Sequence, residues 1–359
     1  RRFRRFGEAM RPRTSVVTIV IMLGRVSERL LALLQLTRMA LVFTAVSNAL
    51  ASLALRHDDR GDVPPTLVIA TLAVAVGLYG FGMALNDIID RRRDQQLQVA
   101  RPLPSGRIGI WSAIVVAGLM LVVATAGGWL FLKTNVDAAM ASAVLLAVTV
   151  LLIATYDAAG KYLVWVGLLL LGLVRFFHAA IPAPHLPVVW HPLFLLNHVA
   201  IISAVAYRSE AKRPPLDGRQ VAYLALGLAA LNLGLIFTLF YRRGLGFAES
   251  LRIEPALLLP TAAAIVFALL GRSVRRKAND RRAAGKALIL YGLLWLIVYD
   301  ALFVIGYVDV WWGLSLLILW PTSFLAVKAM RVWANMTDVA RRPEYVRADS
   351  RLSGPASSR

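Results

Sequence analysis

Hydrophobic residues occur along this chain in long blocks that short polar segments separate. The blocks are roughly 17–23 residues long, about what a helix needs to cross the ~30 Å hydrocarbon core of a bilayer. The pattern predicts ten membrane-spanning helices, over residues 36–55, 66–85, 110–132, 138–155, 162–181, 192–206, 221–241, 254–271, 287–305 and 310–330.

The composition agrees with this pattern. Of the 359 residues, 58% are hydrophobic and 17% are charged, and the mean hydropathy is +0.66. A soluble domain is about 45–50% apolar and about 25% charged. A soluble chain with this apolar excess would expose large patches that aggregate. The sequence therefore excludes a soluble enzyme and predicts an all-α, polytopic membrane bundle.

The charge is strongly positive, with 40 Lys and Arg against 20 Asp and Glu. The basic residues fall in short loops between apolar blocks, where the positive-inside rule explains them without a nucleic-acid partner. If the N-terminus is cytoplasmic, cytoplasmic segments hold 32 Lys and Arg and outer loops hold six. This assignment depends on splitting residues 287–330 into two spans at Gly306–Asp309.

Polar segments flank the apolar region at both ends. Residues 1–35 are expected to form a basic arm with an interfacial helix over 14–35, and residues 331–359 a disordered basic tail. Residues 36–330 are then one membrane domain. There is no Cys, which excludes disulfides, thiolate zinc sites and Cys-ligated iron–sulfur clusters.

The most informative polar segment is Gly82–Gly109, at the expected cytoplasmic end of the second span. On a helix Asn86, Asp90 and Asp94 share one face, with Asp87 one step round. Carboxylates so close together repel each other unless a cation lies between them. Hard oxygen ligands suit Mg²⁺, which also takes water and phosphate oxygens. A solvated helix end is the plainer interpretation of the same charges.

The pattern NDxxDxxxD at residues 86–94, followed by RPLPSG at 101–106, resembles the UbiA superfamily of intramembrane prenyltransferases. Two further segments are similar to that family in the same order. Residues 36–55, with Arg38 and Asn48, look like its first span, and YDAAGK at 156–161 looks like its YxxxK-type loop.

The resemblance implies about nine to ten helices around a central cavity, and Mg²⁺-dependent transfer of a polyprenyl group from its diphosphate to an aromatic or lipid acceptor. The high Arg and Ala content indicates a bacterial source, and the Lys and Arg distribution predicts an inner-membrane protein with its N-terminus and motif loops in the cytoplasm. The metal ligands would be Asn86, Asp87, Asp90, Asp94 and Glu210. The catalytic group would be Asp87, Asp90, Asp94, Lys161 and Glu210, with substrate contacts from Arg38, Asn48, Asn86, Arg101, Arg107, Tyr156, Asp157, Arg175, Lys212 and Arg213.

One departure from the family pattern affects the functional prediction. Relatives carry a second acidic motif after the sixth span, whereas here Glu210 is the only helical carboxylate, beside Lys212 and Arg213, and Asp217 follows two prolines. Glu210 could complete the site together with Asp157, or cations could replace part of the metal charge. The alternative is a non-catalytic relative that binds or transports a polyprenyl (di)phosphate.

Polar residues inside the spans are costly and therefore informative. Arg175 and His178 share a face of the fifth span, and Arg175 could reach the diphosphate or pair with a carboxylate such as Asp300. Asn197 and His198 are expected to be satisfied core or interfacial groups. An ion transporter is a third possibility for the whole protein, but it would need paired acidic groups deep in the spans.

Overall fold

The computed structural model describes residues 26–56, 63–97, 99, 101–134, 138–211, 214–244 and 254–341. Within these ranges the chain is helical and contains no strand. After a helix over 26–36, the elements are η1 (Met39–Leu41), α2 (Val42–Arg56), α3 (Pro65–Gln96), α4 (Ile110–Thr134), α5 (Ala139–Thr155), η3 (Tyr156–Gly160), α6 (Val164–Ala180), α7 (Trp190–Ser209), α8 (Gly218–Arg243), η4 (Pro255–Leu257), α10 (Leu258–Lys277), α11 (Arg281–Tyr307), α12 (Val310–Leu317) and α13 (Leu319–Arg341).

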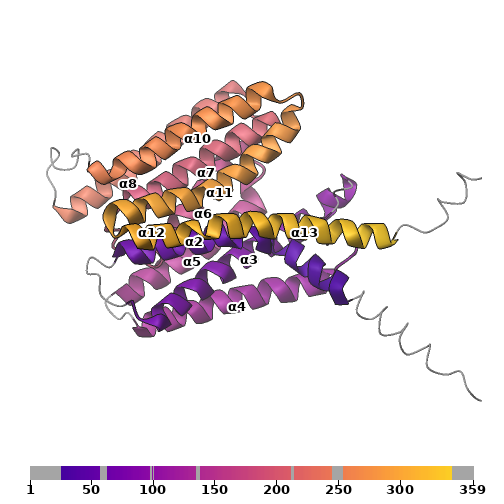
Figure 1. The fold of residues 1–359 in the computed structure, drawn as a ribbon, viewed down its shortest axis with the longest axis horizontal. Coiled ribbons are helices and arrows are strands. Elements are labelled where there is room, and N and C mark those ends of the chain that lie inside the picture. The colour runs from indigo at the N-terminus through magenta and orange to yellow at the C-terminus, as the bar shows by residue number, and fades with distance from the viewer. Residues whose placement is uncertain are drawn as a thin grey trace, which may run out of the picture.

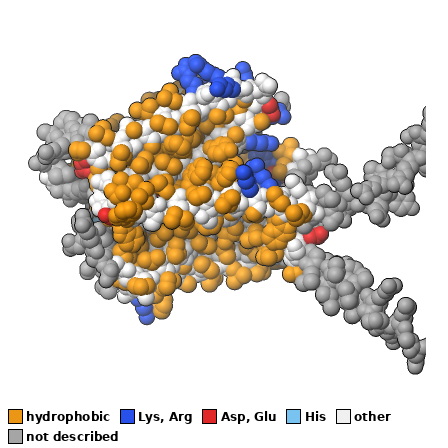
Figure 2. All heavy atoms as spheres, in the orientation of Figure 1, with side chains coloured by type: hydrophobic (Ala, Val, Ile, Leu, Met, Phe, Trp, Pro, Cys, Tyr) orange, Lys and Arg blue, Asp and Glu red, His pale blue; other side chains and the backbone are white. Residues whose placement is uncertain are grey.

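Nine of the ten predicted spans are confirmed. Nine helical segments in the described chain are long and apolar enough to cross a membrane, and α6 is an apolar helix of 17 residues packed among them. The protein is therefore an integral membrane protein with an all-α fold. Hydrophobic side chains cover most of the face seen in Figure 2, as lipid contact requires.

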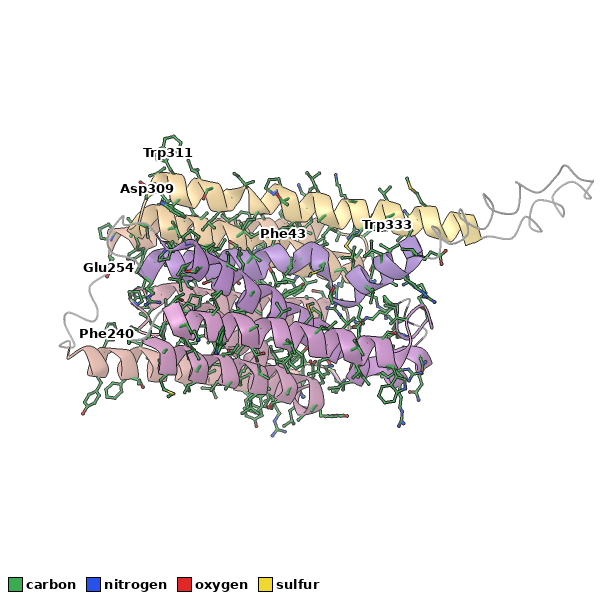
Figure 3. All side chains as sticks on the ribbon, turned by 90° about the horizontal axis from the view of Figure 1, so that it is seen from below. Phe43, Phe240, Glu254, Asp309, Trp311 and Trp333 are labelled. Atoms are coloured by element: carbon green, nitrogen blue, oxygen red, sulfur yellow. The ribbon has the colours of Figure 1, made fainter. Side chains whose placement is uncertain are left out.

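Residues 287–330 do divide into two spans. Helix α11 ends at Tyr307, and the Asp309 carboxylate caps α12 by accepting from the backbone N–H of Trp311 at 2.8 Å and of Trp312 at 3.3 Å. Figure 3 shows Asp309 and Trp311 at one end of the bundle and Trp333 towards the other. The chain reverses direction at this cap, so α13 returns to the end of the bundle where α11 begins.

Two helices extend beyond their predicted ends. Helix α3 continues to Gln96, so the whole acidic motif lies on one uninterrupted helix. Helix α13 continues to Arg341, ten residues or so into the stretch expected to be a disordered tail. The Trp333 indole N–H donates to the Ser27 hydroxyl at 3.1 Å, which ties α13 to the helix over 26–36. Residues 1–25 and 342–359 lie outside the described chain.

The helices alternate in direction through the bundle (Figure 1), so α3, α5, α7, α10 and α13 all finish at one end of it. We call this the motif end. Helices α3 and α4 pack closely along their length: a Cβ at Gly127 would lie 2.8 Å from the Ala73 Cβ, and one at Gly77 would overlap the α4 backbone. This close pairing fixes the helix that carries the acidic motif.

A polar network lies in the middle of the bundle. The Arg175 guanidinium donates to the Asn48 Oδ1 at 3.0 Å, and the Asn48 amide donates to the Asp300 Oδ2 at 2.7 Å. The other oxygen of Asp300 lies 2.7 Å from the His191 Nε2. Asn48 and Asp300 are fully buried. Because neither water nor lipid can hydrogen-bond them there, these contacts supply the partners that their polar atoms need.

Candidate functional site

Four carboxylates converge at the motif end, and we call them the carboxylate cluster. Three come from the last turns of α3 and one from η3, which follows α5: Asp87, Asp90, Asp94 and Asp157. Asp87, Asp94 and Asp157 are buried. Buried carboxylates are stable as charges only if cations or hydrogen-bond donors contact them, and each member of the cluster has such a partner.

Asp87 and Asp94 share one cation. The Arg101 Nη1 lies 3.2 Å from the Asp87 Oδ1 and 2.8 Å from the Asp94 Oδ2. The two aspartates are seven residues apart on α3, which places them on the same face two turns apart. Arg101 therefore bridges two carboxylates that would otherwise repel each other.

Asp90 and Asp157 share a second cation. The Lys161 Nζ lies 2.9 Å from the Asp90 Oδ1 and 3.2 Å from the Asp157 Oδ1. The Asn86 amide also donates to the Asp157 Oδ1, at 2.8 Å. Since Asp90 belongs to α3 and Asp157 to η3, the ammonium group joins the two halves of the site.

The segment that supplies Arg101 is held by its own turns. The backbone N–H of Ser105 donates to the Arg101 carbonyl at 3.1 Å, and Gly106 adopts a positive φ of 73°, which glycine tolerates without strain. Leu103 and Ile108 are buried in the core beside Leu36 and Phe81. These anchors explain why the RPLPSG motif folds back over the end of α3.

The segment that supplies Lys161 is a π-helical turn, Tyr156–Gly160. Such turns are rare in proteins, and those that do occur are often at functional sites. A Cβ at Gly167 would lie 2.5 Å from the Gly160 carbonyl oxygen, so only glycine allows α6 to approach this turn. The Lys161 ammonium also lies 5.7 Å from the centre of the Tyr156 ring.

A third cation comes from a strained residue. Arg38 has a positive φ of 48° at the break that precedes η1, a conformation unfavourable for residues other than glycine. Its Nη2 lies 3.6 Å from the Asp87 Oδ1, and its carbonyl accepts from the Tyr79 hydroxyl at 3.4 Å. Strained backbone that the surroundings enforce is concentrated at functional sites.

The donor set fits Mg²⁺. Hard carboxylate oxygens flank two positions where a cationic nitrogen now lies between a pair of carboxylates. In the part of the chain that the structure describes, no group of three or more His, Cys, Asp or Glu is placed to hold a metal ion by itself. Mg²⁺ does not need one, because it is bound through one or two carboxylates together with waters and phosphate oxygens.

The remaining predicted residues divide into four sets. Arg107 bonds the Gln35 side chain at 2.8 Å and the Ser105 hydroxyl at 3.2 Å. Asn48 and Arg175 belong to the buried network, in which Arg175 reaches Asp300 only through Asn48. Glu210 caps the end of α7 and packs beside Gly285 of α11. Lys212 and Arg213 lie outside the described residues.

Sequence reasoning missed several polar groups that the fold brings into contact. His191, assigned to an outer loop, is buried inside α7, where it contacts Asp300 and lies 3.4 Å from the Ser52 hydroxyl. Thr44 accepts from the Arg175 Nη2 at 3.2 Å. A polar side chain next to an apolar span is the only signal in the sequence for such a residue, and it does not identify the partner.

Comparison with proteins of known structure identifies the fold. No protein-family model matches the sequence, and no curated protein matches it. A solved structure of digeranylgeranylglyceryl phosphate synthase superposes with a TM-score of 0.51 at 18% identity, over 79% of this chain and 99% of that one. The chain has the UbiA fold.

Two further UbiA homologues align over most of their length. The apo protein from Aeropyrum pernix K1 gives a TM-score of 0.49 at 18% identity, over 72% of this chain and 96% of that one. A homologue from Archaeoglobus fulgidus, solved with DMAPP and Mg²⁺, gives 0.43 at 13% identity, over 80% and 99%. At these identities the likeness describes the UbiA fold and assigns no residue.

Proposed function

We propose that this protein is a Mg²⁺-dependent prenyltransferase that moves a polyprenyl group from a prenyl diphosphate to an aromatic or lipid acceptor within the membrane. The observation that carries the proposal is the meeting of four aspartates with three cations at one end of a UbiA fold. The residues that meet there are also those through which the sequence resembles the family. The proposal includes a cytoplasmic motif end in a bacterial inner membrane.

In this proposal the acidic residues of the site bind the metal ion and the basic residues bind the diphosphate. Asp87, Asp90, Asp94 and Asp157, with Asn86, would hold Mg²⁺, which when bound supplies a Lewis acid for the diphosphate oxygens. Arg38, Arg101 and Lys161 would contact the diphosphate directly through charge-assisted hydrogen bonds. Cations that now pair with aspartates would pair with phosphate instead.

The reaction that follows is a substitution at the allylic carbon of the prenyl chain. The carbon–oxygen bond to the diphosphate breaks, and the diphosphate leaves with the bonding electron pair. The acceptor forms the new bond to that carbon and loses a proton. Neutralising the leaving group is the task that three cations within 3.6 Å of the carboxylate cluster are placed to perform.

Binding tests the proposal without knowledge of the acceptor. Purified protein in detergent is titrated with geranylgeranyl diphosphate, with and without Mg²⁺, for the wild type and for Asp87→Asn/Asp90→Asn. Asp280→Asn is the matched control, because it removes a carboxylate that caps α11 outside the cluster, where asparagine caps equally well. We expect the wild type and the control to require Mg²⁺, and the double variant to lose at least about tenfold in affinity.

Three results would contradict the proposal. Tight binding that ignores both Mg²⁺ and the aspartates would favour the non-catalytic alternative, a protein that holds a polyprenyl (di)phosphate through its cations. Absence of binding to this or to longer prenyl diphosphates would leave only the fold. Once an acceptor is found, unchanged transfer by Asp90→Asn would also count against the assigned chemistry.

A further inference from the structure

A second site lies away from the carboxylate cluster. A cleft of about 710 Å³ separates the peripheral helices α8 and α10, and α7 and α11 form its floor. None of the four aspartates, nor Arg38, Arg101 or Lys161, is among its lining residues. The cleft is therefore a separate feature from the site proposed for the diphosphate, and its occupant must be inferred from its own lining.

The floor and walls of the cleft are effectively apolar. Leu193, Phe194, Ile202 and Phe267 contribute hydrocarbon surface, and the polar residues between them bond one another. Asn197 and Asn232 exchange two amide hydrogen bonds, of 2.7 and 2.9 Å, between α7 and α8.

Both ring nitrogens of His198, in the floor of the cleft, also have hydrogen-bond partners within the protein. The His198 Nε2 lies 2.9 Å from the Gly292 carbonyl and its Nδ1 lies 3.2 Å from the Tyr299 hydroxyl. A polar solute would find few free partners in this interior, whereas a hydrocarbon chain needs none.

Charge is confined to one end of the cleft. Arg272 and Arg275 line it where α10 finishes, at the motif end, and both are exposed. No described acidic side chain forms an ion pair with either of them. Ala264 and Ala268 precede the arginines on the same face of α10. Their small side chains leave the groove open along its length, and the arginines lie at its mouth. Figure 2 shows basic side chains gathered towards the end where α10 leads into α11.

The dimensions match a lipid. Along α7 the lining runs from Trp190 to Val205, roughly 22 Å at the helical rise. One leaflet of hydrocarbon is about 15 Å thick, so the cleft can accept the full length of a chain whose headgroup lies at the membrane surface. An apolar channel with two arginines at one mouth is complementary to an amphiphile with an anionic head.

We infer that this cleft binds a bilayer phospholipid with an anionic headgroup, whose phosphate contacts Arg272 and Arg275 and whose hydrocarbon chain lies between α8 and α10. Since bilayer lipid is as apolar as the cleft, the chain gains little by entering it. Selectivity must come from the headgroup. The inference is independent of the proposed prenyl transfer.

Native mass spectrometry of the full chain in detergent tests this inference. The protein is titrated with phosphatidylglycerol and, separately, with phosphatidylcholine carrying the same acyl chains. We expect the wild type to prefer phosphatidylglycerol, and Arg272→Gln/Arg275→Gln to weaken its binding roughly 30-fold, because each arginine contributes about fivefold to attraction for an anionic lipid. Both side chains are exposed, so the variant should fold, which its thermal midpoint checks.

The matched control is Arg276→Gln/Lys277→Gln, which removes the same charge from the same helix end at positions outside the cleft. It should retain phosphatidylglycerol. A third variant, Ala268→Trp, fills the groove and keeps both arginines, and it should lose the lipid as well.

Four results would overturn the inference. Three of them are equal binding of the two lipids by the wild type, equal losses in the two double variants, and full retention of the lipid by Ala268→Trp. The fourth is displacement of the lipid by glycerol 3-phosphate at equal concentration, because it would place recognition of the headgroup on the surface and not in the cleft.

Discussion

Arg101 and Lys161 each contact two carboxylates that could not lie so close without a cation between them. At the scale of single residues, this makes the site a balance of four negative and three positive charges, with Arg38 as the third cation. One further positive charge would neutralise the group. A site in this state can exchange protein cations for a metal ion and an anionic ligand without a large change in net charge.

Replacing Arg101 tests this balance. Arg101→Gln leaves Asp87 and Asp94 buried without their shared cation, and we expect the free energy of unfolding to fall by about 2 kcal/mol in EDTA. Mg²⁺ should restore part of that loss. Thermal midpoints with EDTA and with Mg²⁺ measure both effects. Arg107→Gln is the control, because Arg107 bonds Gln35 and Ser105. Equal losses in both variants would show that Arg101 has no special role.

Among the secondary-structure elements, the π-helical turn Tyr156–Gly160 has the largest effect on the site. It carries Asp157 and places Lys161 next, where these residues meet the last turns of α3. Its position depends on α6, which approaches through Gly160 and Gly167 with no room for a side chain. The turn is therefore held by packing at a distance from the charges that it positions.

Gly167→Ala tests this support. A Cβ there would lie 2.5 Å from the Gly160 carbonyl oxygen, and we expect overpacking to lower the free energy of unfolding by about 1–3 kcal/mol. It should also weaken Mg²⁺-dependent binding of geranylgeranyl diphosphate. Gly118→Ala is the control on α4, where nothing lies within 4 Å, and helix propensity predicts unchanged or slightly higher stability. A thermal midpoint for Gly167→Ala at or above that of the wild type would contradict this account.

On the scale of the whole molecule, the antiparallel arrangement brings both sites to the motif end. The ends of α3, η3 and α10 all lie there, so the carboxylate cluster and the two arginines of the cleft face the same membrane surface. The excess of Lys and Arg in the loops at this end predicts that the surface is cytoplasmic.

Cysteine labelling checks the orientation directly, since the chain contains no Cys. Asn279→Cys places a thiol at the motif end, and Thr66→Cys places one at the opposite end; both positions are exposed. A membrane-impermeant maleimide added to intact cells should modify Thr66→Cys alone, and Asn279→Cys only after lysis. The reverse pattern would invert the orientation.

The sequence by itself determined that this is a helical membrane protein, and it identified the short segments whose charged residues meet at the motif end. These properties are local: a run of apolar residues must be buried in lipid, and charges spaced along one helix identify one face. It could also place Asp87, Asp90 and Asp94 together, because a single helix holds all three.

Only the tertiary structure decided which groups meet across helices. It paired Asp157 with Asp90 through Lys161, linked Arg175 to Asp300 through Asn48, buried His191 beside them, and opened a cleft between α8 and α10. Such contacts depend on how helices far apart in sequence pack, on the glycines that let them approach, and on the cost of leaving a buried charge without a partner. No periodicity in the sequence encodes those distances.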